Sequence, residues 1–147
     1  MTTTQESLWE FVGGRRRGVL ATVGADGMPH LTNVHYLVDE SRRTIWVTTT
    51  TDRVKGRNLL RDPRAALHVQ DEGNWFAFAV AEGPVAIGVA EQVGDQATDD
   101  LHRIFTAFRG AQERPAFDEQ MIRKHRMIIG LTVDRLYGLL PDAEQPA

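Results

Sequence analysis

The chain has 147 residues, 41% of them hydrophobic and 25% charged, which is the size and composition of one folded domain and not of a disordered segment. Its 17 lysines and arginines against 20 aspartates and glutamates give a formal net charge of −3, whereas proteins that bind nucleic acids or anionic membranes usually carry a basic surface, so neither partner is expected. Cysteine is absent, which excludes disulfides, cysteine zinc sites and thiol nucleophiles.

The first predicted element is a helix that ends at a pair of glycines near residue 13. Thr3 and Glu6 have the spacing of a capping box, and Leu8 and Val12 share one helix face. This N-terminal segment has neither the basic region nor the apolar region of a signal peptide. The longest apolar run, Trp75 to Ala81, is too short to span a membrane. We therefore expect a soluble, cytoplasmic protein.

Six strands are predicted from β-branched runs and period-2 alternation. Asp26-Gly27 is a hairpin signal between the first two, and a break or bulge is expected at Gly83-Pro84 in the fifth. In the second strand, the even-numbered residues from 30 to 38 share one face and the odd-numbered residues from 31 to 37 share the other. The predicted strands cover residues 18–23, 30–38, 44–50, 65–70, 75–90 and, as one bulged strand, 127–133 with 136–140.

Three further short helices are predicted, at residues 53–61, 97–109 and 117–125. Strands joined mainly by tight turns, with short helices inserted between them, predict a mainly β fold of the α+β kind. The one-sided alternation of most strands is typical of a barrel wall, so the expected architecture is an antiparallel barrel. The chain is expected to form one domain over residues 1–147, with residues 141–147 as a flexible tail.

The most informative segment is basic and covers residues 48–64. Between Arg53 and Arg64 it holds five basic residues and one acidic residue. Its threonines come from a strand end and Lys55 from a helix start, where free N–H groups and the helix dipole favour an anion. The pattern fits a phosphate cradle or a solvated basic helix, and spacing alone leaves both open. No P-loop or dinucleotide glycine fingerprint is present, so neither type of nucleotide site is expected.

No catalytic constellation stands out in the sequence. The five histidines form neither an HxH nor an HExxH pattern, so no metal site is expected. The two serines lack a nucleophile-elbow pattern, which argues against triad hydrolysis. Trp75 and the phenylalanines after it are suited to stacking on a ring or to core packing. The catalytic residues stay unknown, with solvent, His30 and Tyr36 considered as proton donors.

Three segments in a fixed order carry a family resemblance: GVLATVGADGMPHLTNVHYLVDE, IWVTTTTDRVKGRNLLRDPRAALHV and WFAFAVAEG. Together they resemble the pyridoxamine 5'-phosphate oxidase-like split-barrel family, and within it the actinobacterial flavin/deazaflavin oxidoreductases, many of which use coenzyme F420. The resemblance covers nearly the whole chain, including the final LYGL strand. It implies an antiparallel split β-barrel that forms a homodimer with two cofactor sites at the subunit interface.

The resemblance also implies a set of cofactor-binding residues, matched by position. The family's R-x-K phosphate motif falls on Arg53 and Lys55, after a run of threonines. The strand beside the ring system falls on residues 30–34, with Asn33 as the main side-chain contact. The full implied set is His30, Thr32, Asn33, Val34, Thr48, Thr49, Thr50, Arg53, Lys55, Arg57, Asn58 and Trp75.

By this resemblance the chain is expected to be a coenzyme F420-dependent oxidoreductase that transfers a hydride between the deazaflavin ring and a small organic substrate. The alternatives are an FMN-binding oxidoreductase of the same fold, a non-catalytic cofactor carrier and a haem-handling split barrel. Pyridoxamine phosphate oxidases carry a C-terminal segment with arginine and histidine that completes their substrate site. The chain here ends at RLYGLLPDAEQPA, so oxidation of vitamin B6 is not expected.

Overall fold

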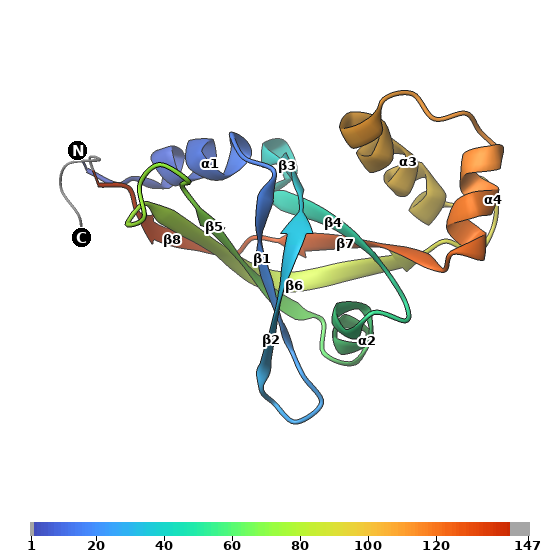
Figure 1. Cartoon of the computed structure of the whole chain (residues 1–147), viewed down its shortest axis with the longest axis horizontal. Helices are drawn as coiled ribbons and strands as arrows, with labels where there is room; N and C mark the ends of the chain where they lie inside the picture. Colours follow the sequence, from blue (N-terminus) through green and yellow to red (C-terminus); the bar gives the residue numbers. More distant parts are fainter. Residues whose placement is uncertain (1, 142–147) are drawn as a thin grey trace.

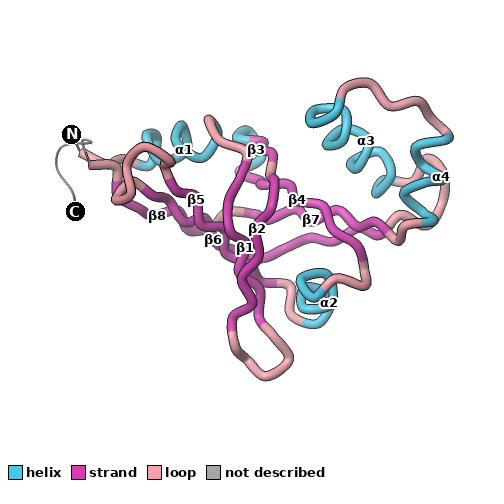
Figure 2. The backbone as a smooth tube through the Cα atoms, viewed as in Figure 1, coloured by secondary structure: helices cyan, strands magenta, loops and turns pink. Residues whose placement is uncertain are grey.

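The computed structural model describes residues 2–141, in which one curled antiparallel sheet is surrounded by four short α-helices (Figure 1, Figure 2). The predicted flexible tail falls almost wholly on residues 142–147, which lie outside the described residues. The helices are α1 (Gln5–Gly13), α2 (Val54–Arg61), α3 (Gln96–Arg109) and α4 (Ala116–Arg123). The strands are β1 (Arg17–Val23), β2 (Pro29–His35), β3 (Leu37–Asp39), β4 (Thr44–Thr50), β5 (Arg64–Gln70), β6 (Phe78–Val89), β7 (Arg126–Thr132) and β8 (Arg135–Leu139).

The strands follow the order β2-β1-β5-β6-β7-β4-β3, and β8 pairs with β6 beside this path. The mainly β, split-barrel architecture is therefore confirmed, and every pairing among the described strands is antiparallel. The core lies on the concave side of the sheet, where α1 closes one end with Leu8, Trp9 and Val12. A second apolar cluster joins α3 and α4 to the outer side of β7 through Ile128.

The second predicted strand is wrong in one respect: it is divided at Tyr36. Residues up to His35 pair with β1, whereas Leu37 to Asp39 pair with β4. The Tyr36 side chain is fully buried, and its hydroxyl donates to the Val12 carbonyl at 2.6 Å. This anchor turns the chain from one half of the sheet to the other.

The break expected at Gly83-Pro84 is also wrong, because β6 is one continuous strand of 12 residues. Its first half pairs with β5 and β8, and its second half pairs with β7. Gly83 lies at the change of partner, where a Cβ atom would stand 2.0 Å from the Thr132 carbonyl oxygen. The glycine is needed for this close approach, and the predicted single bulged strand at the C-terminus is in fact β7 and β8.

β6 begins at Phe78, three residues after the predicted start at Trp75. The other boundaries agree with the prediction to within one or two residues, and β4 has the predicted limits. The cap of α1 differs, because Thr4 rather than Thr3 accepts a hydrogen bond from the Ser7 backbone at 3.0 Å. Ser7 returns the bond by accepting from the Thr4 backbone, so a serine takes the place of the predicted glutamate in the capping box.

Candidate functional site

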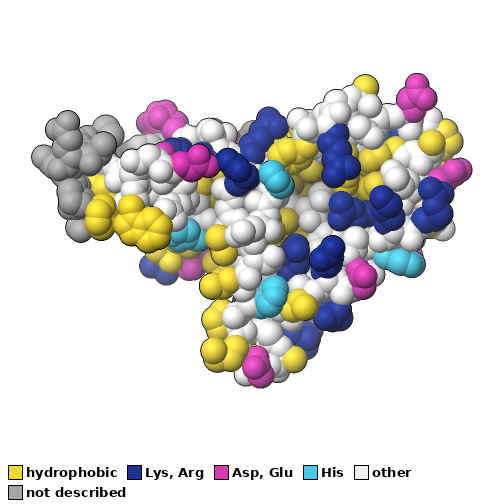
Figure 3. All heavy atoms as spheres, viewed as in Figure 1, with side chains coloured by type: hydrophobic (Ala, Val, Ile, Leu, Met, Phe, Trp, Pro, Cys, Tyr) yellow, Lys and Arg dark blue, Asp and Glu magenta, His cyan; other side chains and the backbone are white. Residues whose placement is uncertain are grey.

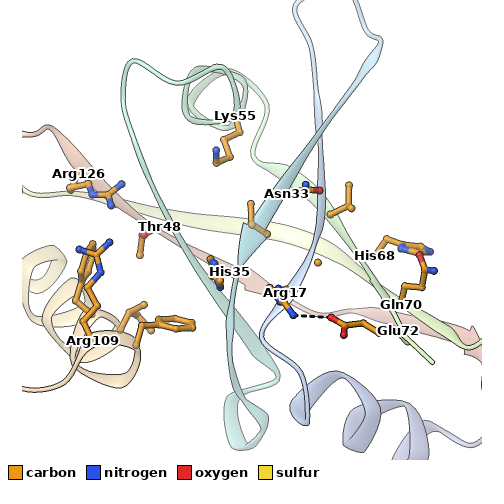
Figure 4. Close-up of a pocket in the computed structure, with 16 residues that line it drawn as sticks. Arg17, Asn33, His35, Thr48, Lys55, His68, Gln70, Glu72, Arg109 and Arg126 are labelled. Atoms are coloured by element: carbon orange, nitrogen blue, oxygen red, sulfur yellow. Dashed lines mark hydrogen bonds and ion pairs between the residues drawn. The ribbon is translucent and has the colours of Figure 1, made fainter. Parts of the chain in front are cut away.

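A pocket of about 760 Å³ lies on the outer side of the sheet, between α2 and α3. Period-2 alternation creates its floor: Leu20 and Leu67 point into the core, so Val19 and His68 point outward. Register places Asn33, Val19 and His68 in one row across β2, β1 and β5. The lining residues are Arg17, Gly18, Val19, Asn33, Val34, His35, Thr48, Lys55, His68, Gln70, Glu72, Ile104, Phe105, Phe108, Arg109 and Arg126 (Figure 4).

The turn between β4 and α2 brings Lys55 to this pocket. The Arg53 backbone N–H donates to the Thr50 carbonyl at 3.2 Å, and α2 begins at the next residue. Gly56 then packs against the end of β4, where a Cβ atom would stand only 2.4 Å from the Thr50 carbonyl oxygen. A glycine at this position therefore lets the helix approach closely enough for Lys55 to reach the pocket wall.

Antiparallel pairing of β4 with β7 adds an arginine from a distant part of the sequence. Arg126, the first residue of β7, lies opposite Thr50 in the register, directly before the turn that carries Arg53 and Lys55. Arg109, in the last turn of α3, lines the same wall. Figure 4 shows Lys55, Arg126 and Arg109 along one side of the pocket, and Figure 3 shows lysine and arginine side chains gathered over this part of the face.

These cations are close enough to perturb one another. Partial burial lowers the pKa of Lys55, and the charges of Arg53 and Arg126 lower it further. Burial likewise lowers the pKa of Arg126, with smaller effects from Arg109 and Arg53. Within residues 2–141, no carboxylate forms an ion pair with Lys55, Arg109 or Arg126. A wall of like charges without a partner is the feature expected of an anion site.

The opposite side of the pocket is neutral or charge-paired. Arg17 donates to Glu72 at 2.8 Å, so this arginine has its counter-ion in the protein. His68 is stacked on Phe78, with ring centroids 5.6 Å apart. Along the α3 wall, His35 meets Phe108 edge to face at 5.7 Å. The pocket therefore combines a cationic side, an uncharged floor of Asn33, Val19 and His68, and aromatic walls, which suits a ligand with a planar ring and an anionic tail.

A family model described as Pyridoxamine 5'-phosphate oxidase matches residues 4–138. The chain belongs to the pyridoxamine 5'-phosphate oxidase family. This family includes oxidoreductases, and proteins of its fold bind flavins. The family and the split-barrel fold predicted from the sequence are therefore confirmed.

Solved structures of this family resemble the chain over nearly its whole length. A conserved hypothetical protein from Mycobacterium tuberculosis is 28% identical, with a TM-score of 0.69 over 92% of this chain and 84% of that one. An F420 reductase is 25% identical, with a TM-score of 0.64 over 93% of this chain and 98% of that one. HutZ, the haem storage protein from Vibrio cholerae, shares the fold at 18% identity, with a TM-score of 0.65 over 93% and 95%.

Four of the residues implied by the pyridoxamine 5'-phosphate oxidase pattern line the pocket: Asn33, Val34, Thr48 and Lys55. Arg53 does not line it but acts on Lys55 and Arg126 through its charge. The implied residues outside the lining are His30, Thr32, Thr49, Thr50, Arg53, Arg57, Asn58 and Trp75.

Three of the implied residues surround a different cavity, of about 440 Å³, between the β1–β2 hairpin and α2: His30, Arg57 and Asn58. Asn58 is buried and donates to the Thr22 hydroxyl at 3.0 Å, and Arg57 donates to the Asp52 carbonyl. The bond from Asn58 holds α2 against β1, whereas the bond from Arg57 is local to the turn before α2.

The other implied residues have different roles in the fold. The Thr49 side chain is buried, and the Thr50 hydroxyl donates to the Asp52 carboxylate. Thr32 is half-buried on the face of β2 that does not carry Asn33. Trp75 is 75% exposed in the β5–β6 loop.

Neither of the two side chains considered as proton donors lies in the pocket. Tyr36 is buried in the core, and this burial raises its pKa well above the usual value. His30 faces the smaller cavity. The histidines that do line the pocket are His35 and His68, which sequence reasoning did not select.

Sequence reasoning also missed Arg109, Arg126 and Phe105. The apolar stripe of residues 97–109 predicted the helix but not which residue of the stripe meets a ligand. Among residues 2–141, no group of three histidine, aspartate or glutamate side chains could hold a metal ion, and no helix is long and apolar enough to cross a membrane.

Proposed function

We propose that this member of the family binds coenzyme F420 in the pocket and is an F420-dependent oxidoreductase that transfers a hydride between the deazaflavin and a small organic substrate. The observation that carries the proposal is the cationic wall of Lys55, Arg109 and Arg126, which have no ion-pair partner within residues 2–141, beside an aromatic-lined pocket. Its volume of about 760 Å³ fits a large planar cofactor. The likeness to an F420 reductase supports the same function.

Different residues of the pocket are suited to bind the phosphate and the ring of the cofactor. Lys55, with the charge of Arg53 beside it, is suited to the phosphate, because charge-assisted hydrogen bonds to phosphate oxygens are strong. The row of Asn33, Val19 and His68 offers the ring a largely flat floor. The hydride chemistry is supplied by the deazaflavin itself when it is bound.

His35 and His68 are the proton-transfer candidates within this proposal, because imidazole is the side chain most often used as a general acid or base. Both rings line the pocket and both are held by an aromatic neighbour, Phe108 for His35 and Phe78 for His68. Phe108 and Phe105 on α3 also shield the pocket from water on that side.

A second function in the same pocket is FMN-dependent oxidoreduction. It is favoured by the position of Lys55 at the β4–α2 turn, since this contact recognises a phosphate and not the ring attached to it. A carrier that binds either cofactor without turnover differs only in lacking hydride transfer. The three alternatives therefore share one fold and differ in the cofactor that is bound and in whether hydride transfer occurs.

A competition experiment tests the proposal. The purified protein is incubated with equal concentrations of F420, FMN and haem, free ligand is removed, and the absorbance spectrum of the retained ligand is recorded. We expect the deazaflavin spectrum. Retained FMN would support the second function, and a Soret band would refute both. Oxidation of the reduced, bound cofactor by added electron acceptors then separates an enzyme from a carrier.

We further propose that the chain works as a homodimer. The outer face of the sheet exposes apolar side chains on neighbouring strands, among them Tyr137 of β8, which is 38% exposed. Leu31 is 64% exposed on the same face, and Leu139 is 37% exposed. A second copy placed on this face would bury these groups and cover the open side of the pocket. Light scattering that finds a monomer at micromolar concentration would contradict this proposal.

A further inference from the structure

The arginines that line the pocket differ in one respect: only some of them have a counter-ion. Arg17 is paired with Glu72, whereas Arg109 and Arg126 form no ion pair or hydrogen bond through their guanidinium groups within residues 2–141. Each guanidinium carries five N–H donors, so the pair presents many donors without an acceptor. The two groups come from α3 and from the start of β7.

A shared aromatic ring holds these two guanidinium groups in place. The Phe105 ring centroid lies 5.1 Å from the central carbon of Arg109 and 5.2 Å from that of Arg126. Phe105 is itself buried and packs edge to face on Phe117 of α4, at 5.5 Å. Cation–π contact with a fixed ring restrains both guanidinium groups, that of the exposed Arg109 and that of the half-buried Arg126. The site is therefore preorganised, although two like charges close together are unfavourable without an anion.

Charge matching shows that one phosphate is not enough for this wall. Lys55, Arg126 and Arg109 contribute three positive charges, and the charge of Arg53 is offset by the exposed Asp52 on the same turn. A phosphate ester carries at most about two negative charges, so a single phosphate leaves at least one of the three cations unneutralised. Arg109 is the one on α3, and Figure 4 shows it on the other side of Arg126 from Lys55.

We infer that Arg109 and Arg126, backed by Phe105, form a second anion subsite, which takes a carboxylate or phosphate group of the ligand beyond the phosphate held at Lys55. This inference rests on the proposed function and names what selects the ligand there: a second anionic group. For F420 that group is a carboxylate of its oligoglutamate tail, whereas FMN has no group to place on the subsite. The residues that select F420 over FMN therefore lie on α3 and β7.

The test compares F420 with the same deazaflavin after its glutamate tail has been removed. Dissociation constants for both are measured by fluorescence quenching in the wild type and in Arg109→Gln, Arg126→Gln and Arg103→Gln. The last is a matched control, because Arg103 lies on the same helix but is paired with Asp100 at 3.4 Å and does not line the pocket. We expect each subsite variant to bind F420 about fivefold more weakly and the tail-less ligand nearly as before.

Equal losses for both ligands would overturn the inference, since the arginines would then serve the first phosphate. Unchanged F420 binding in both subsite variants would overturn it as well. If the wild type binds neither deazaflavin, the proposed function fails, and the subsite is tested separately by thermal shift with inorganic phosphate and inorganic tripolyphosphate. We then expect tripolyphosphate to raise the melting temperature more than phosphate does, and the extra rise to disappear in Arg109→Gln. An equal extra rise in that variant would refute the subsite.

Discussion

Lys55→Ala tests the anion site directly, because it should lower the affinity for the cofactor without destabilising the folded protein. A hydrogen bond from a charged group is worth about 1.5–3 kcal/mol. Arg53 remains beside the phosphate, so we expect the lower end, a loss of about 1.5–2 kcal/mol, which corresponds to an affinity lower by about 10- to 30-fold.

The apoprotein should respond in the opposite direction. Burial and two neighbouring arginines lower the pKa of Lys55, so its charged form is less favourable in the folded state than in the unfolded chain. Removing this ammonium should leave the free energy of unfolding unchanged or raise it slightly. An ordinary structural lysine would behave differently, since its loss would lower stability.

Fluorescence-quenching titration gives the affinity, and urea denaturation of the apoprotein gives the free energy of unfolding. Lys124→Ala is the matched control, because Lys124 is the other lysine of the chain and is exposed after α4. It should change neither quantity. Equal affinity of Lys55→Ala and wild type would refute the phosphate assignment, and a destabilised apoprotein would refute the electrostatic reasoning.

Three further changes address the scaffold around the site. Gly56→Ala places a Cβ atom 2.4 Å from the Thr50 carbonyl, so it should shift α2 and lower both the melting temperature and cofactor affinity, as thermal melts and titration will show. Tyr36→Phe removes one buried hydrogen bond to Val12 and should cost about 1 kcal/mol in urea denaturation while cofactor affinity stays the same. Asp118→Asn weakens the bonds of a buried carboxylate to Arg114 and Gly94 and should cost about 2 kcal/mol at pH 7. Because the Arg114 guanidinium holds the pKa of Asp118 below its usual value, this stability is present above the usual carboxyl pKa and is lost as pH falls through the lower, folded-state pKa. The difference between wild type and Asp118→Asn should therefore shrink in acid.

Local patterns were sufficient for most of the fold. Alternation and the Asp26-Gly27 turn located β1 and β2, and the β-branched run at residues 44–50 located β4 with its limits. The same kind of pattern could not show that Tyr36 divides a strand, since that depends on a hydrogen bond to Val12 in a different element. Nor could it show that β6 changes partner at Gly83 instead of bending there.

The candidate site shows the same division between local and distant information. Lys55 was accessible to sequence reasoning because the threonines before it and the helix after it are neighbours in the chain. Arg126 is about 70 residues away and reaches the site only through its register with Thr50. Arg57 and Asn58 follow Lys55 in sequence but point elsewhere, because a helix turns by about 100° per residue. Adjacency in sequence therefore grouped residues that line two different cavities, and it could not point to Arg126.

The central claim is that a cationic pocket selects an F420-type ligand over a flavin with a single phosphate. The most direct measurement is the pair of dissociation constants of the wild type for F420 and for FMN, each at low and at high salt. We predict that F420 binds more tightly at low salt, by about tenfold, and that the preference shrinks as salt is added because ions screen the partly exposed arginines. Tighter binding of FMN at low salt would contradict the claim.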